Sequence, residues 1–386
     1  MKAPDFTLTA GPTMAAERTL HALGSQIVHH LDPSFIETFR RTTEKAAAFF
    51  HTGNDMLLLQ GEGILALEGA ARSLTRPGMH VLNLVQGVYG KGMGQWLASY
   101  GTVLHEIEVA YNEAVDPADV DEYLTAHPEI ELVTIVHSET PSGTISDCSR
   151  IGPIAHSHGA LTLVDALSSI GGVEFEPDQW QLDVCVSGGQ KCLGGPVGVA
   201  MVSVSPAAWE RMLANEHAPR YSYISLIDWK IGWLENGTFP FTPSVTDVVG
   251  LEAALDAILE EGVENSIARH AKAAAVTRAG VRSMGLQLWP VSEAISGNPI
   301  TAVRVPDGIV HTDLSAHIRE RYSVMLSTGQ SAGNLIHLAH MGPTATGMHQ
   351  IIGLAALGGG LIDLGADVDL GAGIEAAMRV LGGAAS

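Results

Sequence analysis

The chain has 386 residues, and its 21 Lys and Arg against 42 Asp and Glu give a formal net charge of −21. This excess of negative charge opposes binding to nucleic-acid phosphates and to anionic membrane surfaces, so we expect neither class of partner. Hydrophobic residues make up 46% of the chain and charged residues only 16%, which rules out a disordered chain and favours about two folded domains.

The cysteines and the N-terminus predict a cytoplasmic protein. Cys148, Cys185 and Cys192 form no CxxC motif and no even set of pairs, as is typical of a reducing compartment. The first residues contain no apolar signal segment, and no run of about 18 apolar residues follows them.

Seven short apolar runs in the first half of the chain predict a sheet that is buried on both faces. They alternate with helical stretches, which is typical of a mainly parallel sheet in an α/β layer fold. The runs are 56–60, 80–86, 103–109, 132–138, 161–166, 183–188 and 199–205.

The last third of the chain has a different pattern and predicts a smaller α+β domain. A helical pattern over 246–279, broken at Glu261-Gly262, predicts a linker helix. The later runs predict strands at 286–290, 300–306, 323–329 and 335–342, a helix near 312–321, and two terminal helices. We therefore divide the chain into a large domain (1–250, with the N-terminal segment), a linker helix (251–280) and a small domain (281–386).

A glycine-rich turn follows the first strand and begins a helix. The free amides of Gly63 and Ile64 and the helix dipole would form a cradle for an anion. The string from Gly61 to Ala66 also fits the dinucleotide motif G-x-G-x-x-A, but no ribose-binding acid follows the next strand, which ends in Asn83-Leu84-Val85-Gln86. A tight turn with no ligand is the third interpretation.

Asp165 and Lys191 carry opposite charges at the ends of two buried strands. Asp165 needs a cation or a donor there, although it could simply cap a helix. Lys191 lies between glycine pairs, and a desolvated lysine becomes an amine nucleophile for Schiff-base chemistry; an ordinary surface lysine is the alternative. Together they suit a pyridine ring with an aldehyde, which needs an anion at its nitrogen and a lysine at its carbon. Ser187 and Gln190 flank Lys191 and could hold a phosphate or the ring.

At these residues the chain resembles the class V aminotransferases, which are fold-type I enzymes dependent on pyridoxal 5′-phosphate. The resemblance implies a large domain with a seven-stranded mixed sheet, a small C-terminal domain, and a homodimer or a dimer of dimers. The motifs occur in the family's order and span nearly the whole chain: LTAGPT (8–13), TPSGT (140–144), LVDALSS (163–169), SGGQKCLGGPVG (187–198), FTPSV (241–245) and HMGPTA (340–345).

The resemblance also implies a role for individual residues. Lys191 would form the Schiff base and act as general base, and Asp165 would face the ring nitrogen. Tyr89 would stack on the ring, although it could equally be a core aromatic, and Thr140 would donate to the 3-oxygen of the ring. Thr242 would reach the 5′ end of the ring from the neighbouring subunit.

Glu62 departs from the family pattern, which has Ser or Thr at this point of the cradle. A carboxylate repels a phosphate, but it accepts a hydrogen bond from an uncharged hydroxymethyl group. The motifs around 60–74, 87–92 and 139–145 most resemble family members that transfer the amino group of pyridoxamine to pyruvate, in which the B6 compound is a substrate without its phosphate. Alternatively, Glu62 points away or is satisfied by the helix N-terminus.

A second departure concerns the carboxylate of the other substrate. Where the family has an arginine that binds the α-carboxylate, this chain has His337, and a second arginine corresponds to Gln330. His337 could still bind a carboxylate when it is protonated, Gln330 could donate one hydrogen bond, and Arg220 or another cation could reach into the site. Otherwise the amino donor or acceptor lacks an α-carboxylate.

The favoured hypothesis is therefore a cytoplasmic, homodimeric aminotransferase acting on an amine and a 2-oxo acid through Lys191. The first alternative is a transaminase or lyase that retains pyridoxal 5′-phosphate and uses an amine without an α-carboxylate. The second is a non-catalytic or nucleotide-binding α/β protein. We predict no metal site, because His156 and His158 have no third ligand nearby in the sequence.

Overall fold

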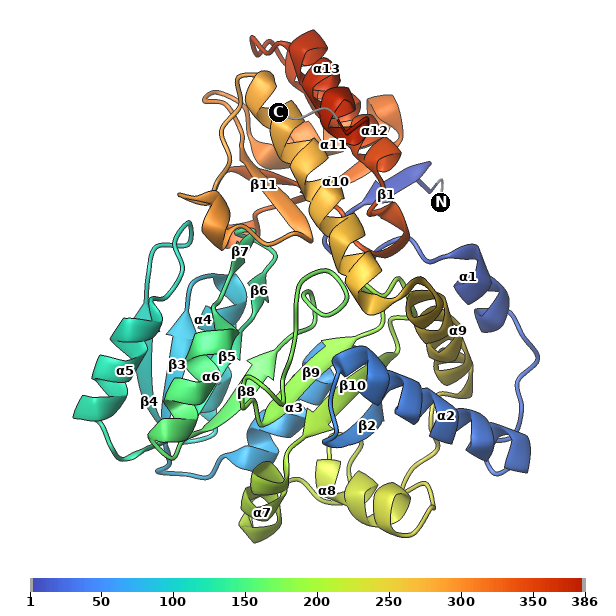
Figure 1. The fold of residues 1–386 in the computed structure, drawn as a ribbon, viewed down its shortest axis with the longest axis vertical. Coiled ribbons are helices and arrows are strands. Elements are labelled where there is room, and N and C mark those ends of the chain that lie inside the picture. Colours follow the sequence, from blue (N-terminus) through green and yellow to red (C-terminus); the bar gives the residue numbers. More distant parts are fainter. Residues whose placement is uncertain (1–2, 384–386) are drawn as a thin grey trace.

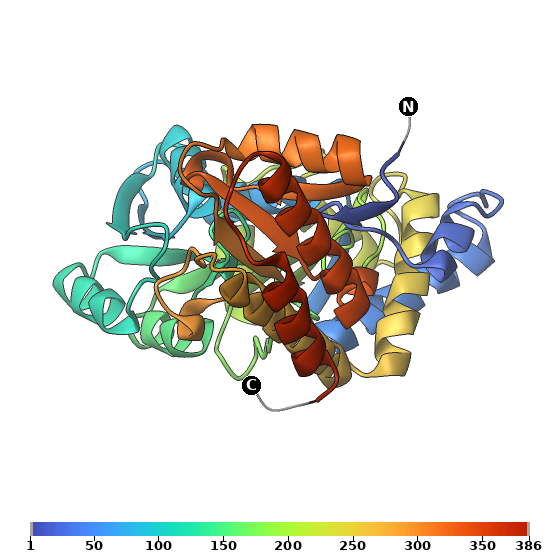
Figure 2. The same ribbon diagram turned by 90° about the horizontal axis from the view of Figure 1, so that it is seen from above.

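The computed structural model describes residues 3–383 and contains two main sheets, one in each half of the molecule (Figures 1 and 2). The large sheet has seven strands in the order β2-β10-β9-β8-β5-β3-β4. Its strands are β2 (Asp55–Gln60), β3 (His80–Val85), β4 (Val103–Glu108), β5 (Ile130–Val136), β8 (Leu161–Asp165), β9 (Val184–Gly188) and β10 (Val199–Val204).

The large sheet confirms the predicted fold class. Every neighbouring pair is parallel except the two that β10 makes with β2 and β9. The seven apolar runs of the sequence coincide with the seven strands, because a strand covered on both faces needs apolar side chains in both directions.

Helices cover both faces of the large sheet. Right-handed crossovers place α3 and α4 on one face, and α5 and α6 on the opposite face (Figure 1). The helices of this half are α1 (Glu17–Leu23), α2 (Pro33–Phe50), α3 (Gly63–Leu74), α4 (Val88–Ser99), α5 (Pro117–Ala126), α6 (Cys148–Ser157), α7 (Pro206–Ala214), α8 (Leu226–Trp229), the π-helix η1 (Lys230–Glu235) and α9 (Val245–Glu261).

The small sheet lies beyond the carboxyl ends of the large one and has its own hydrophobic core. Its order is β1-β12-β13-β11. Its elements are β1 (Phe6–Leu8), α10 (Val263–Ser283), η2 (Glu293–Ile295), β11 (Ile300–Arg304), α11 (His311–Tyr322), β12 (Val324–Thr328), η3 (Gln330–Ala332), β13 (Leu335–Ala339), η4 (Gly342–Thr344), α12 (Gly347–Asp363) and α13 (Leu370–Leu381).

Two expectations for this half were wrong in detail. The N-terminal residues 6–8, which we assigned to the large domain, pair in parallel with β12, and Leu8 is buried in the small core. The segment 286–290 is no strand and makes only an isolated bridge between Leu288 and Val303. Apart from β1, the division into domains stays a prediction.

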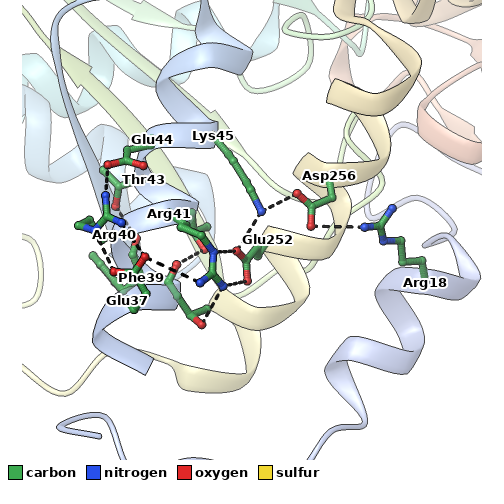
Figure 3. Close-up of polar contacts among 12 residues, drawn as sticks. Arg18, Glu37, Phe39, Arg40, Arg41, Thr43, Glu44, Lys45, Glu252 and Asp256 are labelled. Carbon is green, nitrogen blue, oxygen red and sulfur yellow. Dashed lines mark hydrogen bonds and ion pairs between the residues drawn. The ribbon is translucent and has the colours of Figure 1, made fainter. Parts of the chain in front are cut away.

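The predicted linker consists of two helices that meet at Gly262, whose φ of 90° needs a glycine. Ion pairs tie the first of them, α9, to the N-terminal helices (Figure 3). The Nζ atom of Lys45 lies 2.9 Å from Glu252 and 2.5 Å from Asp256, and Arg18 lies 2.8 Å from Glu260. These ion pairs hold α1 and α2, at the start of the large domain, against α9, the helix at its end.

A two-stranded ribbon of β6 (Ser138–Glu139) and β7 (Thr144–Ile145) encloses the TPSGT turn and lies toward the small half. Within residues 3–383, no helix combines the length and the apolar character that crossing a membrane requires.

Gly63 is the first residue of α3, and we expect that it tolerates no side chain. A Cβ atom there would lie 2.0 Å from Cδ2 of Leu167, which is buried and follows Asp165 closely. Gly63→Ala should therefore lower the free energy of unfolding by about 1–3 kcal/mol, measured by denaturant unfolding. Gly92→Ala in α4 is the matched control: a Cβ meets nothing there within 4 Å, so that variant should be unchanged or slightly more stable. Equal stability of the two variants would contradict the packing argument.

Candidate active site

The predicted chemical residues meet at the carboxyl ends of the parallel strands. Asp165 is the last residue of β8, Lys191 follows β9, and Tyr89 lies in the first turn of α4, just after β3. Because parallel strands present their carboxyl ends at one edge of the sheet, residues far apart in the sequence come together here.

Lys191 is covered by the N-terminal segment. Its Nζ atom donates to the carbonyl oxygen of Ala10 at 2.8 Å, and a Cβ atom on Gly11 would lie 2.6 Å from the same nitrogen. Burial lowers the pKa of Lys191, while the charges of Asp165 and Glu62 partly oppose that shift. The lysine is therefore held as a desolvated amine, as a nucleophile or base requires.

Asp165 is buried, with 7% of its surface exposed, and faces the same space. Its Oδ1 atom accepts from the backbone nitrogen of Leu167 at 3.0 Å, so it does cap the following turn. Burial raises its pKa to about 6, with the charge of Glu62 acting in the same direction, while the Leu167 hydrogen bond and the charge of Lys191 lower it. A cation brought close to this carboxylate would be strongly favoured.

Glu62 occupies the cradle at the start of α3. One carboxylate oxygen accepts from the backbone nitrogen of Ile64 at 2.8 Å, and the other accepts from Nε2 of Gln190. The carboxylate is thus satisfied by the helix N-terminus, as one alternative held, yet it lies close enough to Asp165 and Lys191 to affect both pKa values. The Oε1 atom of Gln190 is buried and has no partner within the described chain.

A cavity of about 420 Å³ lies beside this group, between the N-terminal segment, the TPSGT turn and the small sheet. Tyr89, Thr140, Gln330 and His337 all line it. Burial raises the pKa of Tyr89, and hydrogen bonds with Thr140 and Gln330 oppose that shift. Among the described residues that line the cavity there is no Lys, Arg, Asp or Glu.

His337 lies on β13 and is 1% exposed. Its Nε2 atom lies 2.9 Å from the carbonyl oxygen of Pro141, so that nitrogen carries the proton and donates it. Burial lowers the pKa of His337 to about 4, although the Pro141 bond acts in the opposite direction. At neutral pH it is therefore an uncharged group and supplies no cation for a carboxylate.

The other predicted residues are spread around the site. Ser187 is buried on β9, two residues before the lysine-bearing turn. Arg220 does not line the cavity; its Nε atom pairs with Asp228 at 2.8 Å. Thr242 is exposed, as a residue offered to a second subunit would be. The roles of these three residues remain predictions.

Glu139 comes just before the TPSGT turn, a position from which the sequence suggested only that it could line the cleft. It is completely buried, and its two oxygens accept from the backbone nitrogens of Tyr89 and Gly90 at 3.2 and 2.6 Å. A Cβ on Gly87 would lie 2.4 Å from its carboxyl carbon. Burial raises its pKa to about 7, and the two amides oppose the shift. Glu139 therefore fixes the first turn of α4, which carries Tyr89.

Comparison with known proteins identifies the family of this chain. Residues 12–347 match the profile of the family Aminotransferase class-V. The chain belongs to the class-V aminotransferases. A pyridoxamine–pyruvate transaminase of Mesorhizobium japonicum is 45% identical over 98% of this chain and 97% of its own.

Solved structures agree with this assignment. The crystal structure of pyridoxamine-pyruvate aminotransferase from Mesorhizobium loti matches with a TM-score of 0.96 at 45% identity, over 100% of this chain and 98% of that one. A ureidoglycine-glyoxylate aminotransferase from Bacillus subtilis matches with a TM-score of 0.93 at 26% identity, over 98% and 99%. The class-V enzyme described here is therefore an aminotransferase with the fold-type I architecture.

Replacing Asp165 should remove a pH dependence of this aminotransferase. With a pKa of about 6, the carboxylate becomes protonated as the pH falls through 6. We therefore expect kcat/KM to decrease below about pH 6. Asp165→Asn should lower kcat/KM at pH 8 by at least about 100-fold and abolish the acidic limb. Asp367→Asn, at an exposed position, should leave the profile unchanged. An acidic limb that persists in Asp165→Asn would assign it to another group.

Proposed function

We propose that this aminotransferase takes its amino group from a B6 vitamer without a phosphate, such as pyridoxamine, and passes it to a small 2-oxo acid such as pyruvate. The observation that supports this proposal is the Glu62 carboxylate in the cradle of α3, where it already accepts the amide of Ile64. The 45% identity to a pyridoxamine–pyruvate transaminase points in the same direction.

The cradle suits a hydroxymethyl group better than a phosphate. Two negative charges 4 Å apart repel by about 4 kcal/mol at an effective dielectric constant of 20, whereas a hydroxyl can donate to a carboxylate. The unpartnered Oε1 atom of Gln190 is a further acceptor for such a hydroxyl. Asp165 and Lys191 fit the B6 ring itself, with or without a phosphate.

When bound, the B6 ring supplies a carbon that carries the amino group and a ring that accepts its electrons. Lys191, whose pKa is lowered by burial, would take a proton from the carbon that gives up the amino group and return it to the carbon that receives that group. Asp165 stabilises a proton on the ring nitrogen from its buried position, and Tyr89 limits the movement of the ring within the cavity. The N-terminal segment at Ala10 and Gly11 lies against Lys191 and partly covers it.

The test is direct. Purified protein is mixed with pyridoxamine and, in separate reactions, pyruvate, oxaloacetate or glyoxylate, and pyridoxal is followed by absorbance. Turnover with pyridoxamine that greatly exceeds turnover with pyridoxamine 5′-phosphate supports the proposal. Absence of pyridoxal with all three acceptors would refute it.

A second function is favoured by the uncharged cavity. Because its described lining has no cation and His337 is neutral, an amine or acceptor without an α-carboxylate would fit, with pyridoxal 5′-phosphate retained as a cofactor. The spectrum of the purified protein separates the two functions. A yellow protein that releases a phosphorylated vitamer on denaturation favours the second, and a colourless protein that binds added pyridoxal favours the first.

We also propose that the enzyme is a cytoplasmic homodimer, or a dimer of dimers, in which the exposed Thr242 reaches the partner's site. Analytical ultracentrifugation would give the assembly. A monomer that is fully active would contradict this role of Thr242.

A further inference from the structure

Three side chains with metal-binding atoms converge far from the active site. They are His80, His105 and Glu129, and one ligand atom of each lies within 4.8 Å of the other two. The Nδ1 atom of His80 lies 3.0 Å from Nε2 of His105 and 3.9 Å from Oε1 of Glu129. We propose that these residues form a site for a divalent transition-metal ion of the zinc type.

The fold explains why these residues meet. His80 is the first residue of β3, and His105 lies on the adjacent edge strand β4, paired with Leu82. His80 and Leu82 are two residues apart on β3, so their side chains point to the same face of the sheet. Leu82 is paired with His105, and both imidazoles therefore lie on that face. Glu129 comes from the segment between α5 and β5. The cluster therefore lies at the amino ends of the strands, about 20 Å, one strand length, from the carboxyl ends where Lys191 lies.

The distances between the ligand atoms suit an ion with tetrahedral coordination. Zinc bonds of about 2.0–2.1 Å to nitrogen and oxygen place neighbouring ligand atoms about 3.3 Å apart. The observed separations of 3.0 and 3.9 Å bracket that value. Small side-chain rotations would therefore bring the three ligand atoms to zinc-binding distances. Two imidazoles and one carboxylate leave a fourth position for water or for His127, whose Nδ1 atom lies 3.1 Å from Oε1 of Glu129.

A hydrogen bond from its surroundings orients His105 as a metal ligand. Its second nitrogen, Nδ1, lies 3.1 Å from the hydroxyl of Tyr123. In the tautomer in which Nδ1 donates its proton to that oxygen, the lone pair of Nε2 is directed at His80.

Binding is tested on the complete protein after treatment with a chelator. Isothermal titration with ZnCl₂ should give one ion per chain, and CoCl₂ should give the absorption bands of a tetrahedral site. Because loss of a residue that merely orients a ligand costs about 10–100-fold in affinity, His105→Ala should weaken zinc binding by at least about 100-fold and Tyr123→Phe by about 10-fold. Zinc should raise the Tm of the wild type and not that of His105→Ala.

Other histidines supply the matched control. His29 and His30 are neighbours at the surface, with ring centroids 4.6 Å apart, and changing both to Ala should leave zinc affinity unaltered. Glu129→Gln tests the third ligand with little change in shape. The proposal is wrong if the wild type binds no zinc stoichiometrically, or if binding survives in His105→Ala and Glu129→Gln. It is also wrong if binding is lost in the His29/His30 variant.

Discussion

Lys191→Ala should abolish transamination, with kcat reduced by at least about 10⁴-fold, because the variant loses both the amine that bonds to the B6 carbon and the base that moves its proton. Within residues 3–383, the charges that shift the pKa of Lys191 are those of Asp165, Glu62 and Cys192, and none of these groups is an amine that could replace it. The assay is the formation of pyridoxal from pyridoxamine, measured at enzyme concentrations high enough to detect the residual rate.

Lys272→Ala is the control for this variant, because Lys272 is exposed in α10. It should retain wild-type activity. Borohydride reduction in the presence of pyridoxal should label wild-type protein on the peptide that contains Lys191 and should not label Lys191→Ala. Full activity of Lys191→Ala would remove the lysine from the mechanism, and a label on another lysine would place the site elsewhere.

The sequence predicted the large sheet well, because its strands are buried on both faces. Their continuous apolar runs, such as 56–60 and 199–205, differ from every neighbouring segment. The small domain gave weaker signals. The short strand β1 could not be assigned from the sequence, since its partner β12 lies more than 300 residues away and local pattern carries no information on such pairing.

The candidate site was predictable in part for a similar reason. Asp165 and Lys191 are charges at the ends of apolar strands, which is unusual enough to notice in the sequence. Glu139 is also an acid after a strand, but its role depends on the amides of Tyr89 and Gly90, fifty residues earlier. The segment that covers Lys191, at Ala10 and Gly11, approaches it only through the tertiary fold. The histidine–glutamate cluster likewise joins three separate stretches of the chain.

Glu62→Ser should reverse the preference of the enzyme between free and phosphorylated vitamers. In the wild type, the amide of Ile64 and the Nε2 group of Gln190 donate to the Glu62 carboxylate. Removing that carboxylate frees both donors, which can then bind an anion at the helix N-terminus. A hydrogen bond to a charged group contributes about 1.5–3 kcal/mol, so kcat/KM for pyridoxamine should fall about 10–100-fold. Affinity for pyridoxal 5′-phosphate should rise by a similar factor, measured by absorbance titration.

Glu68→Gln separates this effect from a general loss of negative charge on α3. Glu68 lies on the same helix but pairs with Arg72 at 2.9 Å, and its side chain is 37% exposed. That variant should keep the wild-type preference, because its charge lies outside the cradle. If Glu62→Ser loses pyridoxamine activity without gaining affinity for the phosphate, then Glu62 serves only to cap α3, and the selectivity must come from another part of the site. If both variants gain that affinity equally, the net charge of the helix decides it and the local contact does not.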